Sequence, residues 1–341
     1  MSYSMQVDEL IDGMAKPPGS LGLLEKHVKR VLLSWGGMQE LKPYHLIFAA
    51  DNGVVAEGVA AFPPVITYLQ AQNMVDGRAT INAFCRCYGI PCEVMDVGVN
   101  GAKAVGTDRK AADGSKNFAK EAAMSESEYA YVWAAAAGRV QTAAEEEGFN
   151  LFSFGEMGIG NTTTSSAVLH ALTGIETEFV VGYGAGQPCS ELLKKKRNAI
   201  TKGMLLHKDS LHTTQDILRC LGGFDIVAMC AAMLKCTELH IPFVIDGFIS
   251  AVAYACAARM DEQAKLYAIP SHLSKEPGMI YALLLGGILA DEVPIRANMA
   301  LGEGTGAVLM VGLLKAMLAA ITSTARLSDF DLGDPALKAS V

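Results

Sequence analysis

The chain has 341 residues, of which 51% are hydrophobic and 19% are charged, and its formal net charge is −8. This composition favours a large buried core over disorder, and the length allows one large domain or two ordinary ones. The negative net charge argues against a nucleic-acid-binding surface. So does the lack of a Lys/Arg stripe apart from residues 194–197. The polar, acidic N-terminus predicts no signal peptide, and no clean apolar run of about 18 residues suits a membrane span.

The eight cysteines are scattered along the chain and lie mostly in apolar contexts. Cys85 and Cys87 are separated by a single residue, which is not the usual spacing of a zinc knuckle or a redox pair. We therefore expect buried thiols in a reducing cytosol, and no metal site.

Strand patterns and helix patterns alternate along most of the chain. Short apolar runs that end in Gly, Asp, Ser or Thr predict buried strands opening into loops, and longer apolar or amphipathic segments between them predict helices. The expected strands cover residues 46–51, 92–98, 151–155, the start of 179–186, 241–246 and 267–270. The expected helices cover residues 5–36, interrupted by a turn at 16–20, then 64–88, 126–148, 161–172, a long helix beginning near 221–225, and 247–260.

This alternation predicts an α/β fold with a mostly parallel sheet and helices on both faces. The loops that follow the strands would gather at one edge of the sheet, where the sites of such folds lie. The segments at both chain ends are helical. We therefore expect a small helical domain from residues 1–40 and 285–341, and a large domain from residues 41–284.

The strongest site signal is the segment 156–164, Glu-Met-Gly-Ile-Gly-Asn-Thr-Thr-Thr, which follows the third strand. A glycine-rich turn with hydroxyls at a helix start directs backbone N–H groups, the helix dipole and side chains at one anion, so it predicts a phosphate site. The alternative is an ordinary strand-to-helix turn. The segment is neither a Walker loop nor a dinucleotide fingerprint, which makes an NAD-dependent oxidoreductase a poor interpretation. One of the lysines at 194–196 could also reach an anion, or the three form a solvated charge run.

Glu303 lies between two glycines in the sequence Leu-Gly-Glu-Gly-Thr-Gly-Ala at residues 301–307. Glycine lacks a Cβ, so backbone and ligand can approach closely there. A carboxylate in a dry environment has a raised pKa and can accept a proton from a ligand near neutral pH. The alternative is a helix N-terminus, where Glu complements the helix dipole. His272 is the only histidine in a loop that resembles a site, and a lone histidine is more often structural.

Several motifs, in order along nearly the whole chain, resemble those of the nicotinate-nucleotide–dimethylbenzimidazole phosphoribosyltransferase family of cobamide lower-ligand synthesis. Each motif alone is weak, whereas the ordered set is specific. The motifs are KPPGSLG at 16–22, DNGV at 51–54, EGV at 57–59, QAQNM at 70–74, GEMGIGNTT at 155–163, GGFD at 222–225, DGFIS at 246–250, SH at 271–272 and LGEGTG at 301–306.

The resemblance implies a Rossmann-like large domain, a small helical domain from both chain ends, and a cytoplasmic dimer with sites near the interface. It implies transfer of the phosphoribosyl group of nicotinate mononucleotide to an aromatic lower-ligand base, which gives an α-ribotide and nicotinate. No cofactor or metal is implied, because the electron-poor pyridinium is already a good leaving group. Glu303 would be the general base. The nicotinate nucleotide would be bound by Glu156, Gly158, Asn161, Thr162, Thr163, Gly184, Lys195 and Ser274, and the acceptor by Val59, Phe62, Gln70 and Leu301.

Three features depart from the family pattern. Asn52 stands where many relatives carry His, and Tyr183 and Ala185 replace the Arg and Thr often seen in the Gly-x-Gly-x-Gly loop. Phe62 occupies a position where relatives that use benzimidazoles can have a small hydroxyl residue. A bulky apolar residue removes a polar anchor and shrinks the pocket. Phenol or p-cresol therefore stays open as the acceptor beside dimethylbenzimidazole, with Gln70 holding the hydroxyl group.

The pairing of subunits is also open. Relatives that use phenols have two paralogous subunits, so the dimer is either a homodimer or a pair with a paralogue. A second hypothesis is that this chain is a degenerate partner subunit, which keeps the fold but supports the active site of a paralogue. The retained Glu303 and the 155–164 loop argue against this hypothesis, and the altered 183–185 loop argues for it.

Overall fold

The computed structural model describes residues 3–184 and 186–330, and within them six parallel strands form one sheet in the order β3-β2-β1-β4-β5-β6. This is the strand order of a doubly wound Rossmann sheet, and it confirms the predicted α/β class. From β1 the chain adds β2 and β3 on one side and then β4, β5 and β6 on the other, so the loops after β1 and β4 diverge and leave a crevice at the carboxyl ends of these parallel strands. The strands are β1 (Pro43–Ala50), β2 (Cys92–Gly98), β3 (Thr107–Asp108), β4 (Leu151–Met157), β5 (Phe243–Ile245) and β6 (Ala268–Pro270).

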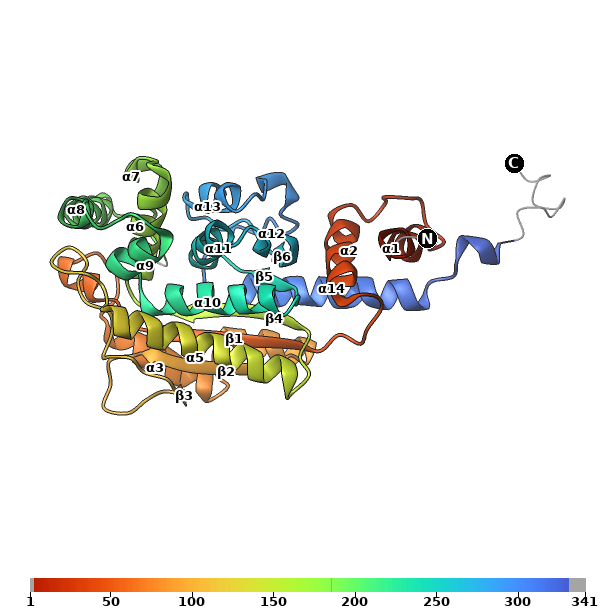
Figure 1. Cartoon of the computed structure of the whole chain (residues 1–341), viewed down its shortest axis with the longest axis horizontal. Helices are drawn as coiled ribbons and strands as arrows, with labels where there is room; N and C mark the ends of the chain where they lie inside the picture. Colours follow the sequence, from red (N-terminus) through yellow and green to blue (C-terminus); the bar gives the residue numbers. More distant parts are fainter. Residues whose placement is uncertain (1–2, 185, 331–341) are drawn as a thin grey trace.

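Helices cover both faces of the sheet (Figure 1). The helices on the first face, or packed behind it, are α5 (Glu126–Glu145), α6 (Asn161–Thr173), α7 (Thr177–Val180), α8 (Ser190–His207), α9 (Thr214–Leu221), α10 (Phe224–Glu238), α11 (Phe248–Met260), α12 (Ala264–Tyr267) and α13 (Met279–Leu285). The helices on the second face are α1 (Tyr3–Asp12), α2 (Leu23–Trp35), α3 (Val65–Val75), α4 (Thr80–Tyr88) and α14 (Thr305–Ser323). Short 3-10 turns lie at Gly53–Glu57, Ala290–Glu292 and Leu327–Asp329.

The alternation of side chains along β1 explains the two layers. Leu46 and Phe48 pack into the core with α5 and α10, whereas Ile47 and Ala49 pack into the core with α14 and α4. All four side chains are fully buried. A parallel strand buried on both faces has a nearly continuous apolar sequence, which is why this run was recognisable in the sequence.

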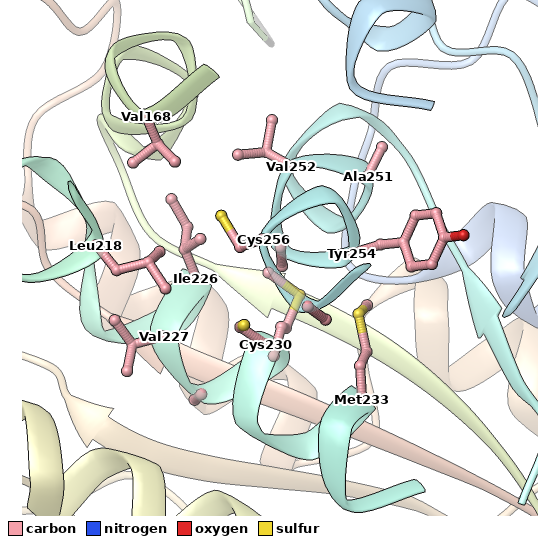
Figure 2. Packing of buried hydrophobic residues seen from close by; sticks show 14 of the residues in the cluster. Val168, Leu218, Ile226, Val227, Cys230, Met233, Ala251, Val252, Tyr254 and Cys256 are labelled. Carbon is pink, nitrogen blue, oxygen red and sulfur yellow. The ribbon is translucent and has the colours of Figure 1, made fainter. Parts of the chain in front are cut away.

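Small and medium side chains fill the core between α10 and α11. Cys230 and Met233 of α10 face Val252 and Cys256 of α11 (Figure 2). Burial raises the pKa of the Cys230 thiol well above its ordinary value. All eight cysteines are free, and five of them are buried, so the expected buried thiols are confirmed at these five positions. Cys87 and Cys189 are exposed and depart from that expectation.

Two segments differ from the predicted elements. The helix expected over 64–88 is two helices, α3 and α4, because Gly77 adopts a left-handed φ of +73° and ends the first. The strand expected at the start of 179–186 is instead the end of α7. There the carbonyl of Val180 accepts a hydrogen bond from Ser166 Oγ at 3.0 Å. In a strand, this carbonyl would instead accept from the backbone of a neighbouring strand. Ala185 lies outside the described residues.

α14 is long and apolar enough to cross a membrane, which the sequence analysis did not expect. It is the one such helix in the described ranges, and 56% of its apolar window is buried inside the protein. The helix packs against β4, β5, α2 and α4. An apolar core helix has these same properties.

α1 and the segment that follows α14 lie close together (Figure 1). After α14, Arg326 donates through Nη1 to the Leu10 carbonyl at 2.8 Å, and Leu327 N donates to Gly13 O at 2.9 Å. α1 and α14 both pack against α2 or its loops. The division into a small domain (1–40 and 285–341) and a large domain (41–284) stays a prediction.

Candidate active site

A pocket of about 370 Å³ opens at the carboxyl ends of the strands. Its walls come from the end of β4, from the loops after β1, β5 and β6, and from the segment before α14. This is the crevice between β1 and β4, where the order of the strands in the sheet switches side. The sequence analysis expected the site at this edge, and most of the proposed residues meet here.

Glu303 lies just before α14 in an unusual backbone conformation. Its φ angle is +62°, and those of Gly302 and Gly304 are both +85°. Glycine adopts this left-handed region readily and other residues do so rarely, which explains the flanking glycines. A Cβ on Gly302 would also overlap the Glu156 carboxylate. The sequence predicted that a ligand or the backbone approaches these glycines closely. In the structure, protein side chains occupy this space.

The Glu303 carboxylate is buried and held at both oxygens. Gln70 Nε2 donates to Oε1 at 2.6 Å, and Ile81 N donates to Oε2 at 3.4 Å. Only 5% of the residue is exposed. Burial raises the pKa of this carboxyl and outweighs the bonds from Gln70 and Ile81, which lower it. Glu303 can therefore accept a proton from a weak acid in the pocket.

A pair of buried carboxylates, those of Glu156 and Asp225, lies beside Glu303. The Asn161 amide donates to Glu156 Oε2 and, at 2.9 Å, to Asp225 Oδ2. Burial, together with the nearby Asp225, raises the pKa of Glu156 to about 8. Burial raises the pKa of Asp225 to about 6. Like charges so close in a dry site cannot all ionise readily, so Glu156 holds a proton near neutral pH.

Asp246 and His272 close the floor of the pocket. Asp246 Oδ1 accepts from Ala307 N, in the first turn of α14, at 2.9 Å, and lies 3.8 Å from His272 Nδ1. Burial raises the pKa of Asp246, which His272 lowers in part. A Cβ on Gly306 would overlap the His272 ring, so this glycine is needed for the helix to approach. These contacts anchor α14 over the carboxyl ends of β5 and β6.

The opposite end of the pocket is built to hold an anion. Gly160, with φ of +96°, turns the chain into α6, whose N-terminus faces the pocket. Lys196 Nζ donates to Thr162 Oγ1 at 3.0 Å and to Gly182 O at 2.8 Å. An ammonium group has three hydrogens, so among the described residues one remains for a ligand. Burial lowers the pKa of Lys196 to about 8, and the nearby Glu276 raises it in part.

Glu276 fixes the loop beside Lys196. Its Oε1 accepts from Gly184 N at 2.8 Å, and a Cβ on Gly182 would overlap its carboxylate. Its Oε2 has no hydrogen-bond partner within the part of the chain that the structure describes. Burial raises the pKa of Glu276, while Lys196 lowers it. The glycines of this loop therefore make room for a carboxylate from the loop after β6.

An apolar wall lines the side of the pocket next to Glu303. Val59 is fully buried, Phe62 is 47% exposed and Leu301 is 49% exposed. Ile66 and Gln70 of α3 complete this wall. A flat aromatic ring fits such a wall, and Gln70 and Glu303 are the polar groups beside it.

The pocket contains most of the predicted site residues. Thr163 is buried away from it, and Lys195 is exposed on α8 and does not line it; Lys196 lines it instead. The pocket also includes Glu276, whose role the sequence analysis missed. The predicted residues that line the pocket are Val59, Phe62, Gln70, Glu156, Gly158, Asn161, Thr162, Gly184, Ser274, Leu301 and Glu303.

The positions that depart from the family pattern differ in location. Tyr183 lines the pocket. Asn52 does not line it, and its Oδ1 accepts from Thr164 Oγ1 at 3.2 Å behind the start of α6. The side chain at position 52 thus supports α6 from outside the pocket. Phe62, in contrast, forms part of the apolar wall next to Glu303.

The fold is a doubly wound α/β sheet, and its pocket joins a buried carboxylate to the N-terminus of a helix. The sequence profile of the family described as phosphoribosyltransferase matches residues 2–330. The chain therefore belongs to this phosphoribosyltransferase family, and it is a pentosyltransferase. The resemblance inferred from the ordered motifs is confirmed.

Relatives of known name match nearly the whole chain. The nicotinate-nucleotide–dimethylbenzimidazole phosphoribosyltransferase of Shewanella amazonensis is 38% identical over 336 residues, which is 96% of this chain and 95% of that protein. The enzyme of the same name from Vibrio cholerae is 36% identical over 326 residues, 92% and 94% of the two chains. The crystal structure of CobT from Thermus thermophilus matches with a TM-score of 0.88 and 34% identity, covering 96% of this chain and 97% of that one.

Proposed function

We propose that this enzyme transfers the phosphoribosyl group of nicotinate mononucleotide to an aromatic lower-ligand base for the assembly of a cobamide nucleotide loop. The products are an α-ribotide and nicotinate. The observation that carries the proposal is that a buried carboxylate, Glu303, and an anion-binding end built from α6 and Lys196 share one pocket. The relatives named above supply the substrate class, and the apolar wall beside Glu303 suits an aromatic acceptor.

The chemistry follows from the positions of these groups. The acceptor atom attacks C1′ of the ribosyl group while the bond from C1′ to the pyridinium nitrogen breaks. The electron pair of that bond neutralises the pyridinium, and nicotinate leaves. Glu303 takes the proton that the acceptor loses, so charges and atoms balance. Attack from the face opposite the leaving group converts a β-linked donor into an α-linked product.

The protein's contribution is positioning and anion binding. We propose that the phosphate of the donor is held by the N-terminus of α6, Thr162, Gly184 and Lys196, with Ser274 beside them. Glu156 and Asn161 lie between this end and Glu303, where the ribose would sit. Thr163 and Lys195 are not among the groups that this proposal uses.

The acceptor we propose first is dimethylbenzimidazole, because the named relatives carry it in their names. Phe62 is the observation that favours phenol or p-cresol, since it adds bulk and removes a polar anchor. Gln70 is less free to hold a phenolic hydroxyl than the sequence suggested. Its Nε2 donates to Glu303, and its Oε1 accepts from Asn73 Nδ2 at 3.3 Å.

An assay with mixed acceptors tests the function. The purified chain is incubated with nicotinate mononucleotide, dimethylbenzimidazole, phenol and p-cresol, and the ribotides are identified by mass spectrometry. We expect a ribotide of dimethylbenzimidazole in excess. A strong excess of phenolic ribotides would move the proposal to that acceptor class. No product from any acceptor by the chain alone would favour the partner-subunit hypothesis.

We also propose a dimer in the cytoplasm. Val65 and Leu69 are exposed apolar side chains one turn apart on α3, and the exposed Phe62, which precedes this helix, lines the pocket, as expected for a subunit contact near the site. Free thiols are typical of proteins in a reducing compartment. Light scattering of the purified chain measures its mass. A monomer at all concentrations would contradict a homodimer and direct the search to a paralogous subunit.

A further inference from the structure

Two polar side chains are buried in the sheet directly beneath Glu303. His45 of β1 and Ser153 of β4 are paired in the register of the two strands, and both are 0% exposed. Their neighbours on the same face, Ile47 and Leu151, are apolar. Burying a polar group is unfavourable unless it is hydrogen-bonded, so this pair should be explained by the bonds it makes.

These bonds form a chain that ends on the backbone of Glu303. His45 Nε2 lies 3.0 Å from the Glu303 carbonyl oxygen, and Nδ1 lies 2.7 Å from Ser153 Oγ. A carbonyl only accepts, so Nε2 carries the hydrogen, and Nδ1 accepts from the Ser153 hydroxyl. Burial lowers the pKa of His45 to about 4, so the ring is neutral and keeps one tautomer near neutral pH.

His45 contacts the carbonyl of Glu303, the residue with the left-handed φ of +62°. A Cβ on Gly155 would overlap the Glu303 carbonyl, and a Cβ on Gly304 would overlap the His45 ring. The Glu303 N–H lies near the carboxylate of Glu156 and lowers the pKa of Glu156 in part. Both polar groups of this backbone unit therefore face side chains from the sheet. The helix does not fix them, since α14 begins only at Thr305.

We propose that His45 and Ser153 are positioning residues for the reaction, in which Ser153 orients the His45 ring and His45 holds Glu303 in its left-handed conformation. The carboxylate then points into the pocket at Gln70 and the acceptor wall. This inference rests on the proposed role of Glu303 as the base. A displacement of about 1 Å at a reacting group lowers the rate by up to about 100-fold, so holding the peptide has a measurable effect.

The test compares two replacements of His45. His45→Leu removes the donor, and we expect kcat to fall about 10-fold to 100-fold while KM for nicotinate mononucleotide changes less than about twofold. His45→Gln places an amide N–H near the position of Nε2, and we expect it to restore at least part of kcat. Ser153→Ala leaves the ring able to donate but less well oriented, so we expect a smaller loss of kcat.

His207 provides a matched control. It is also buried, and its Nε2 lies 2.9 Å from the Phe118 carbonyl, but it does not line the pocket. Both leucine variants should lower the thermal unfolding midpoint, but His207→Leu should leave kcat unchanged. Equal losses of kcat in the two leucine variants would overturn the inference, as would wild-type kcat in His45→Leu.

A structural readout keeps this test separate from the proposed function. If the wild type transfers to no acceptor, the function fails, and the inference is then decided by crystal structures of the variants. It predicts that His45→Leu or Ser153→Ala shifts the Glu303 peptide and lengthens the 2.6 Å bond to Gln70. An unchanged φ and an unchanged bond would overturn it. Should His45→Leu fail to fold, Ser153→Ala, which deletes one oxygen atom, decides by both readouts.

Discussion

The two ends of the pocket handle charge in different ways. At the acidic end, Glu303, Glu156 and Asp225 are buried together, and their bonds run mainly to protein amides. At the anion-binding end, Lys196 is also buried but keeps one hydrogen without a partner among the bonds of the site. The acidic end is therefore complete without substrate, whereas the other end has a donor left for one.

This difference suggests a division of work. Burial raises the pKa of the acids and lowers that of Lys196. Both ends of the pocket therefore carry less charge near neutral pH than the same residues would carry in water. A base needs a fixed direction, which the amides and the left-handed backbone of Glu303 give it. A phosphate site needs a free donor and a positive field, which Lys196 and the start of α6 give it.

The largest effect is expected at the base. Glu303→Gln keeps the shape and a bond to Gln70 but cannot take a proton, so kcat should fall on the order of 1000-fold. The measurement is steady-state ribotide formation, with Glu40→Gln on the surface as the control. Near-normal turnover of the Glu303 variant would exclude the proposed role and remove the functional contrast between the two ends.

Glu156 tests the electrostatics of the acidic end. Its pKa rises from an ordinary 4.5 to about 8, so between these values the folded protein binds a proton that the unfolded chain lacks. Stability therefore falls as pH rises through this window, and Glu156→Gln removes the loss. From about pH 5.5 to about pH 8, the unfolding free energy of the variant should rise relative to wild type on the order of 3 kcal/mol.

Urea unfolding at the two pH values measures this difference. Glu145→Gln replaces an exposed acid and should unfold like the wild type at both. A stability difference between the Glu156 variant and the wild type that stays constant across the window would mean that Glu156 is charged in the folded protein. Both ends of the pocket would then contain a buried charged side chain, Glu156 at one end and Lys196 at the other.

Lys196 and Lys195 form a matched pair at the other end. Lys196→Met removes a buried, charge-assisted donor, so KM for nicotinate mononucleotide should rise about 10-fold to 100-fold with kcat less affected. Lys195→Met replaces an exposed side chain and should leave KM unchanged. Circular dichroism checks that both variants fold. The reverse result would place the phosphate on the outer side of α8.

The smallest effect concerns the acceptor wall. Phe62→Ser introduces a hydroxyl and opens space next to Gln70, so the ratio of benzimidazole to phenol ribotides should rise about 3-fold to 10-fold. Phe62 is half exposed, so the fold should tolerate this change. Competition between the two acceptors in one reaction measures the ratio directly. A constant ratio would show that Phe62 does not select the acceptor.

The sequence predicted the parts of this molecule that depend on local pattern. Apolar runs ending in Asp or Gly gave the strands, and the glycine-rich turn at 156–164 gave the helix start at the pocket. The choice among the three lysines depends on helix phase. Leu192, Lys196 and Ile200 recur every four residues and are all buried, so helical spacing distinguishes Lys196 from its two neighbouring lysines.

Other features depend on contacts between distant segments. Nothing in the local sequence shows that His45 reaches Glu303 or that Glu276 fills the space left by Gly182. A polar residue inside an apolar strand indicates only that some partner exists. The strand expected at the start of 179–186 was wrong because its short apolar pattern suits the end of a helix equally well.

α14 joins the pocket to the chain ends. It has 19 residues, so at about 1.5 Å per residue it is about 28 Å long. Glu303 precedes its first turn, and beyond its last turn Arg326 is bonded to the backbone of α1. A stiff helix carries a tilt from one end to the other. We therefore expect a fusion partner at the amino terminus that disturbs the packing of α1 to shift α14 and, with it, Glu303.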